Sequence, residues 1–187
     1  EQDQGNIENA KKIYLSLINN FNNLNSRLNL YNILLQEKNY LESLKLVNNI
    51  LEDNNDLVNV WIDKAYIHYK IKEYDVSKEI CHSILNKINN NIKALNLIGL
   101  CFFKEKKYEE SLEYLFKSLS IDNKNVPVLN SIAEVYYELR NLKKTEEYFL
   151  KALKINPNAY KTLNNFAGYY LETNKSKKAI ELYEKAL

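Results

Sequence analysis

The side chains best suited to catalysis or metal binding are two histidines and two cysteines, and their spacing argues against both roles. Cys81 and His82 are adjacent in a segment with helical periodicity, so their side chains point about 100 degrees apart and do not easily bind one metal ion. His68 and Cys101 fall on apolar positions of similar segments, where packed core residues are expected. The three glycines are isolated and form no phosphate-binding loop. We therefore expect no enzymatic activity, no catalytic residue, no metal site and no cofactor.

The elements that must position any functional side chain are pairs of amphipathic helices. In residues 126–159, apolar or small residues recur at gaps of three and four, which is typical of two helices. These residues are Leu129, Ile132, Ala133 and Tyr136 in the first helix, and Thr145, Phe149 and Ala152 in the second. Shifting the frame by 34 residues in either direction gives the same residue classes, so the sequence predicts a solenoid of helix pairs.

The repeated pattern resembles the tetratricopeptide repeat (TPR), a helix-turn-helix unit of 34 residues. The frame at Ile92 has Leu95, Ile98, Gly99, Phe102, Ser111, Leu115 and Ser118 at the characteristic positions, and the frame at Tyr160 has Leu163, Phe166, Ala167, Tyr170, Ala179, Tyr183 and Ala186. The frames at Leu24 and Val58 match more loosely. The resemblance implies an all-α, right-handed superhelical solenoid of antiparallel helix pairs. Its expected units are 24–57, 58–91, 92–125, 126–159 and 160–187, after an N-terminal helix of a partial repeat in residues 1–23.

Helix ends can be assigned from the same frames and from Asn and Pro. We expect helices at about 24–37, 40–53, 58–71, 74–88, 92–105, 108–121, 126–139, 142–155, 158–172 and 175–187. Asn156 and Pro157 are interpreted as an N-cap followed by proline at the first helical position, and Pro127 as a first-turn residue. Gly99 and Ala133 stand where two helices of one repeat approach closely, which requires a small residue.

Composition excludes several classes of partner. The 26 basic and 24 acidic residues are interspersed and leave a net charge of +2, so we expect no nucleic-acid binding and no attraction to an anionic membrane. No apolar run approaches the roughly 20 residues that span a bilayer, so we expect no membrane insertion. The two cysteines favour a cytoplasmic location with reduced thiols, although a disulfide between them is geometrically conceivable.

The start and end of the sequence suggest a piece of a longer protein. The chain has no Met and stops inside the second helix of its last unit, which favours a fragment or a processed form. A processed form could have lost a targeting segment, so the cell envelope or periplasm is the alternative location. Ile180, Tyr183, Ala186 and Leu187 form an apolar edge there, which is explained either by continuation of the parent protein or by self-association.

The resemblance implies a concave groove, lined by the first helix of each unit, that binds an extended or helical peptide. The fifth residue is an asparagine in each of the units 92–125, 126–159 and 160–187. These residues, Asn96, Asn130 and Asn164, could form a ladder that hydrogen-bonds a peptide backbone. The alternative is compositional, because Asn is abundant throughout the chain, as in proteins from AT-rich genomes.

Aromatic and charged residues follow the same groove. Tyr69, Phe103 and Tyr137 take the twelfth position and Tyr66 lies one turn before Tyr69, so these rings either anchor a partner or extend the core. The thirteenth position is basic in the middle, at Lys70 and Lys104, and acidic later, at Glu138 and Glu172; an ordinary solvated helix face gives the same pattern. The Lys and Asn clamp by which chaperone-binding members hold a C-terminal carboxylate is missing from the matching positions.

These observations together favour a non-catalytic scaffold that binds a protein or peptide partner in its concave groove. Two alternatives stay open. The chain could be the substrate-recruiting arm of a larger enzyme, as in TPR-bearing glycosyltransferases, or an assembly protein that self-associates through its C-terminal edge.

Overall fold

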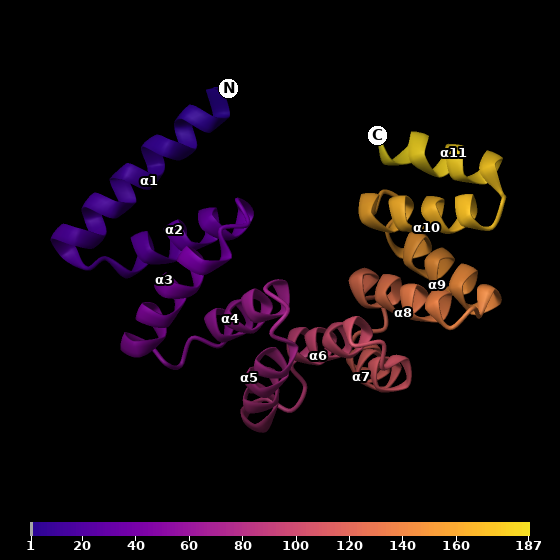
Figure 1. Ribbon diagram of the computed structural model, residues 1–187, viewed down its shortest axis with the longest axis horizontal. Helices are drawn as coiled ribbons and strands as arrows, with labels where there is room; N and C mark the ends of the chain where they lie inside the picture. Colours follow the sequence, from indigo (N-terminus) through magenta and orange to yellow (C-terminus); the bar gives the residue numbers. More distant parts are fainter. Residues whose placement is uncertain (1) are drawn as a thin grey trace. The chain divides into compact units, whose positions relative to one another are not determined.

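The computed structural model describes residues 2–187 and consists of helices joined by short turns (Figure 1). The helices are α1 (Gln2–Phe21), α2 (Leu24–Gln36), α3 (Tyr40–Asp53), α4 (Val58–Lys70), α5 (Tyr74–Lys87), α6 (Ile92–Lys104), α7 (Tyr108–Ile121), α8 (Val126–Glu138), α9 (Leu142–Ile155), α10 (Tyr160–Glu172) and α11 (Ser176–Ala186). Residues 2–187 contain no strand, so the predicted all-α helical-repeat solenoid is confirmed. The chain forms two compact units, Glu1–Ile84 and Leu85–Leu187, which are described separately below.

The turn inside each helix pair has the same backbone geometry in all five pairs. Its key residue has a positive φ of 58° to 68° and is Lys38, Lys72, Lys106, Arg140 or Asn174, at intervals of 34. In the third pair the amide of Lys106 donates to the Phe103 carbonyl and the amide of Lys107 donates to the Phe102 carbonyl, at 3.0 and 2.9 Å. These two bonds satisfy the last carbonyls of the helix and define a Schellman motif. A position that usually favours glycine is therefore occupied by a charged or polar side chain five times.

Asparagine is the N-cap residue of several helices that come first in their helix pair. Asn23, Asn91 and Asn125 each accept a hydrogen bond from the amide three residues later, at 2.9 to 3.2 Å. This is the N-cap role, which satisfies one of the free donors at the start of a helix. Pro127 lies in the first turn of α8, as predicted.

The prediction for Asn156 and Pro157 is wrong. Asn156 is the C-cap of α9, and its amide donates to the Ala152 carbonyl at 3.0 Å. Its side chain accepts from the amide of Asn158 at 3.1 Å, which makes an Asx turn. The next helix, α10, starts at Tyr160 with Ala159 as its N-cap, so Pro157 lies in the turn before the helix.

Buried hydroxyls link the two helices of the first three complete pairs. The side chains of Ser43, Ser77 and Ser111 donate to the carbonyls of Tyr31, Ala65 and Gly99, at 3.2, 2.8 and 2.8 Å. In the fourth pair the Thr145 hydroxyl instead donates to the carbonyl of Asn141, the N-cap of the same helix α9, at 3.0 Å. A hydroxyl at this position therefore fixes the distance between neighbouring helices in three pairs.

The close approach at Gly99 is confirmed by the space around it. A Cβ atom built on Gly99 would lie 2.8 Å from Cγ and 2.9 Å from Cδ2 of Leu115, which is closer than real Cβ contacts. Leu115 belongs to the core of the second unit, with Val128, Ile132, Val135 and Tyr136. A second cluster in this unit packs Phe149 on Phe166, with ring centroids 5.0 Å apart.

The core of the first unit contains Tyr31, Val47, Ile50, Leu51, Val60 and Ile67. His68 is also buried there, and its Nδ1 lies 2.6 Å from Oε2 of Glu73, as expected for a packed residue. The side chains of Cys81 and Cys101 are both buried. Within residues 2–187 no three His, Cys, Asp or Glu side chains are placed to hold a metal ion, and no helix is long and apolar enough to cross a membrane.

Candidate functional site

A pocket with a volume of about 330 Å³ lies in the second unit, on the side formed by the first helices of its pairs. The first helices are neighbours, because α6 contacts α8 and α8 contacts α10. The pocket residues are Phe103 from α6; Glu134, Tyr137 and Glu138 from α8; Phe149 from α9; and Asn164, Asn165, Gly168, Tyr169 and Glu172 from α10. It therefore opens where the sequence predicts the groove.

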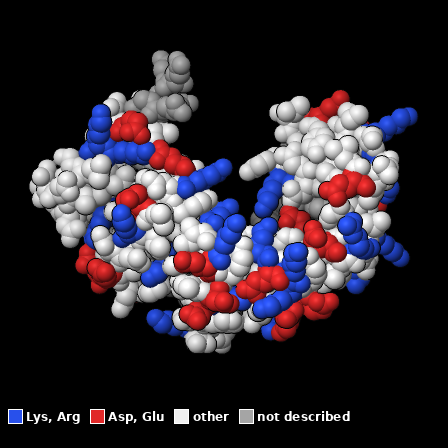
Figure 2. Space-filling view, viewed as in Figure 1, with Lys and Arg blue, Asp and Glu red and all other residues white. Residues whose placement is uncertain are grey.

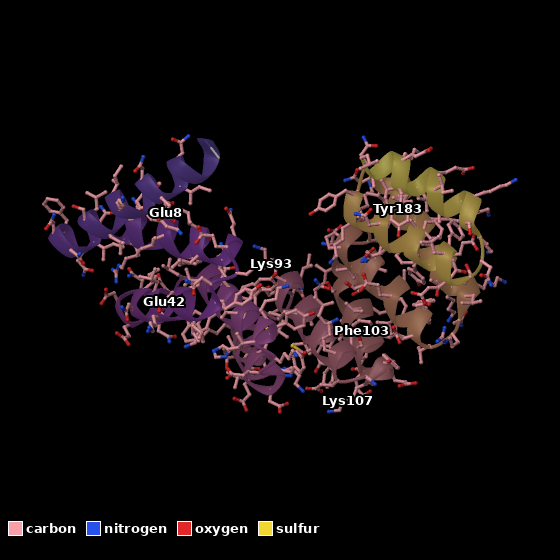
Figure 3. All side chains as sticks on the ribbon, turned by 45° about the horizontal axis from the view of Figure 1, so that its top comes forward. Glu8, Glu42, Lys93, Phe103, Lys107 and Tyr183 are labelled. Carbon is pink, nitrogen blue, oxygen red and sulfur yellow. The ribbon has the colours of Figure 1, made fainter. Side chains whose placement is uncertain are left out.

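The groove candidates Phe103, Tyr137 and Asn164 meet in this pocket, together with Glu138 and Glu172 from the acidic end of the predicted groove. Phe103 is labelled on α6 in Figure 3. The ring of Tyr137 stands edge-on to Tyr169, with centroids 5.8 Å apart and planes at 89°, and its hydroxyl donates to Glu172. Aromatic rings and carboxylates thus line the pocket together.

The polar centre of the pocket is Glu134, which the sequence analysis did not single out. Oε1 of Glu134 accepts from Nδ2 of Asn130 at 2.6 Å and also from Nδ2 of Asn165. Asn165 reaches Oδ1 of Asn130 as well, at 3.4 Å. No donor among the described residues reaches the other carboxylate oxygen, Oε2. The carboxylate is therefore held through one oxygen, and the second accepts no hydrogen bond from this part of the chain.

Burial raises the pKa of Glu134, because the charged carboxylate loses hydration. Lys161 and Lys104 oppose this shift through their charges, and the hydrogen bonds from Asn130 and Asn165 oppose it by favouring the charged form. Both lysines are exposed, and the ammonium of Lys104 lies 5.2 Å from the centre of the Phe103 ring. The loss of hydration outweighs these opposing effects, so the pKa of Glu134 stays above its ordinary value.

The three Asn residues of the predicted ladder have different environments. Asn164 is exposed at the pocket, whereas Asn130 is 2% exposed and serves the Glu134 network. Asn96 is half-buried, and its Oδ1 has no hydrogen-bond partner among residues 2–187. The ladder stays a prediction, and Asn164 is the member most open to a peptide.

The remaining predicted residues gather in the first unit. Tyr66 and Tyr69 are stacked with centroids 6.2 Å apart, and the ammonium of Lys70 lies 5.3 Å from the Tyr66 ring. Tyr69 also packs against Tyr74 at 5.9 Å. Tyr66 is exposed, so this aromatic patch is accessible on α4.

A signal for the missed residues was present in the ninth position of each repeat. That position reads Asn32, Tyr66, Leu100, Glu134 and Gly168. The first three repeats have uncharged side chains at this position. The fourth repeat has a carboxylate there, and the fifth has a glycine, which has no side chain. Comparing this position across repeats would have indicated a polar pocket between α8 and α10.

Charge on the visible face of the molecule is mixed, with Lys and Arg interspersed among Asp and Glu (Figure 2). Many cations are used internally: in α9 the ammonium of Lys151 lies 2.6 Å from Glu147 and 4.5 Å from the centre of the Tyr148 ring.

The fold and the pocket together define a helical-repeat protein with a groove on one side. Family models of the tetratricopeptide repeat match residues 92–125, 126–159 and 148–181. The chain belongs to the tetratricopeptide repeat family, whose members are in general non-catalytic scaffolds for protein interactions.

Solved structures support the same fold. TTC0263, a thermophilic TPR protein from Thermus thermophilus, has a TM-score of 0.80 at 17% identity, over 88% of this chain and 90% of its own. MamA from Desulfovibrio magneticus RS-1 has a TM-score of 0.68 at 15% identity, over 84% of this chain and 90% of its own. YrrB, described as a TPR protein with an unusual peptide-binding site, has a TM-score of 0.55 at 15% identity, over 91% of this chain and 88% of its own. Comparison with curated protein sequences gave no match.

Proposed function

We propose that the chain is a non-catalytic scaffold that binds a peptide segment of a protein partner in the groove of its second unit. The observation that carries the proposal is the pocket between α8 and α10, which combines aromatic walls with polar groups that are not all used internally. Pockets of roughly 300 to 1,000 Å³ with a few directed polar groups are typical of binding sites. A peptide side chain or short segment matches the volume of about 330 Å³.

Three features support a peptide in particular. Tyr137 and Tyr169 are rigid aromatic groups of the kind that dominate binding energy at interfaces. Asn164 is exposed beside them and can both donate to and accept from a peptide backbone. YrrB, which shares the fold, is described as having a peptide-binding site.

The test is selection of short peptides from a random library on the immobilised chain, followed by measurement of affinity by calorimetry. Gly168→Leu fills the pocket at a position with no neighbouring atom within 4 Å of a built Cβ, so the variant is expected to fold. Lys154→Ala, on the exposed surface of α9, is the matched control. We expect Gly168→Leu and Tyr137→Ala to weaken binding about tenfold or more, and the control to bind like the wild type. Selected peptides that bind all four proteins equally would show that the pocket is not the binding site.

A second function, self-association, is favoured by the exposed apolar side chains of α11. Ile180 is 55% and Tyr183 is 38% exposed there, and Tyr183 is labelled in Figure 3. Light scattering over a range of concentrations tests this function. A constant monomer mass, unchanged in Ile180→Lys, would contradict it.

A further inference from the structure

We infer that the pocket between α8 and α10 binds a cationic side chain, a lysine or arginine of the partner. This inference rests on the proposed peptide-binding function and specifies the chemistry of the bound residue. It is carried by the shape of the pocket, by the unused oxygen of Glu134 and by the acids around the rim.

The shape suits a long side chain with an apolar stem. Phe103, Tyr137 and Tyr169 supply aromatic surface, against which methylene groups can pack. Gly168 leaves one side open, since a Cβ atom built there meets nothing within 4 Å. This contrasts with Gly99, where packing against Leu115 leaves no room for a Cβ atom. The missing side chain at Gly168 therefore creates space in the groove and relieves no clash.

The hydrogen bonds of Glu134 select a donor. Asn130 and Asn165 both donate to Oε1, which fixes the orientation of the carboxylate, while Oε2 accepts no hydrogen bond from the described residues. An ammonium or guanidinium group supplies the missing donor and a compensating charge. A neutral apolar side chain would remove water from this oxygen without supplying a donor in its place, which is unfavourable.

The charges around Glu134 also favour a cation over an anion. Glu138 and Glu172 line the same pocket, so three carboxylates face the bound group. The opposing charges are those of Lys104 and Lys161, and both side chains are exposed to solvent, where screening weakens their effect. A carboxylate or phosphate entering the pocket would meet the three acids at close range.

The direct test uses small probes and nuclear magnetic resonance of the full chain. We would titrate the ¹⁵N-labelled protein with Nα-acetyl-lysine methylamide and with its neutral analogue Nα-acetyl-norleucine methylamide. The lysine probe is expected to give saturable shifts at the Gly168 amide and the Asn165 side-chain amide, with at least about tenfold higher affinity than the neutral probe. Equal affinity for the two probes, or no saturable shift with the lysine probe, would overturn the inference.

Glu134→Gln identifies the responsible group. Glutamine keeps an oxygen that can accept from Asn130 and Asn165 but removes the charge, so the fold is preserved and lysine binding is expected to fall about tenfold. Glu138→Gln provides a second charge-neutral variant at an exposed position that needs no packing. Lys154→Ala is again the control and is expected to bind the lysine probe like the wild type. Unchanged lysine affinity in Glu134→Gln, with a circular dichroism spectrum like that of the wild type, would also overturn the inference.

The two proposals fail in different ways. If the selected peptides bind the groove but lack a basic residue, the peptide-binding function is supported and the cation-binding pocket is contradicted. If the lysine probe binds at Glu134 but no peptide is selected from the library, the cation-binding pocket is supported and the peptide-binding function is contradicted.

Discussion

Replacing Lys106 by glycine should stabilise the protein although it removes a side chain. Lys106 has φ 62° in the turn between α6 and α7, in the left-handed region that disfavours residues with a Cβ atom. Its amide is fixed there by the bond to Phe103, and the next amide, of Lys107, is fixed by the bond to Phe102. The Lys106 side chain is exposed and makes no ion pair or ring contact within residues 2–187, so its removal should break nothing in this part of the chain.

The expected gain is the difference between two effects. The left-handed conformation costs a residue with a Cβ atom about 1 to 2 kcal/mol, and glycine avoids this cost. Glycine in turn loses more backbone freedom on folding, which offsets roughly 0.5 to 1 kcal/mol. The net stabilisation is about 0 to 1.5 kcal/mol, and its midpoint of about 0.75 kcal/mol corresponds to a rise in Tm of about 1.5 to 3 °C for a chain of this size.

Thermal and denaturant unfolding followed by circular dichroism measure this gain. Lys106→Ala is the matched control, because it removes the same charge and methylene groups but keeps Cβ, so its stability should stay close to the wild type. The same substitution at Lys72 should give a similar gain, since that residue has φ 68°. Stability of Lys106→Gly equal to or below that of Lys106→Ala would refute the reasoning.

The remaining predictions concern the two glycines, the buried hydroxyl and the pocket acid. Gly99→Ala should destabilise the protein by about 1 to 2 kcal/mol, because the added Cβ atom overpacks against Leu115. Gly168→Ala should stabilise it by about 0.5 to 1 kcal/mol, because alanine has the higher helix propensity and the added Cβ atom meets no neighbour. Chemical denaturation measures both changes, and equal effects would contradict the packing argument. Ser111→Ala should lower the free energy of unfolding by about 1 kcal/mol by removing the bond to the Gly99 carbonyl, with wild-type stability as the contrary result. The raised pKa of Glu134 stabilises the fold below its unfolded pKa, and this contribution is lost as pH rises through the folded pKa. Glu134→Gln should therefore gain stability relative to the wild type between about pH 4 and about pH 7 in melting experiments, and a constant difference would contradict the burial of the charge.

The sequence predicts most helix starts because the 34-residue period and the Asn caps act locally. The predicted starts at residues 24, 58, 92 and 126 agree with α2, α4, α6 and α8. The predicted start of α10, at residue 158, lies two residues too early. Asn156 followed by Pro157 suits either a helix start or the turn after a helix end. The amide of Asn156 bonds to Ala152 of the preceding helix, and the sequence alone does not determine this bond.

The site could be predicted in part for a similar reason. Phe103, Tyr137 and Asn164 face the pocket because one period places them on the same side of successive first helices. The Glu134 network joins Asn130 of one repeat to Asn165 of the next. Such contacts depend on how far each repeat rotates relative to its neighbour, and the periodicity of the sequence does not specify this rotation.

The two helical glycines show which part of the second unit serves packing and which part does not. Glycine in a helix interior costs about 1 kcal/mol relative to alanine. At Gly99 this loss is offset, because Leu115 packs where a Cβ atom would lie. At Gly168 no packing offsets it, and the half-buried carboxylate of Glu134, whose pKa is raised by lost hydration, lines the same pocket and is also unfavourable for folding. Residues that break local rules without a structural gain are expected at functional sites, and here two of them lie together on the groove side of α8 and α10.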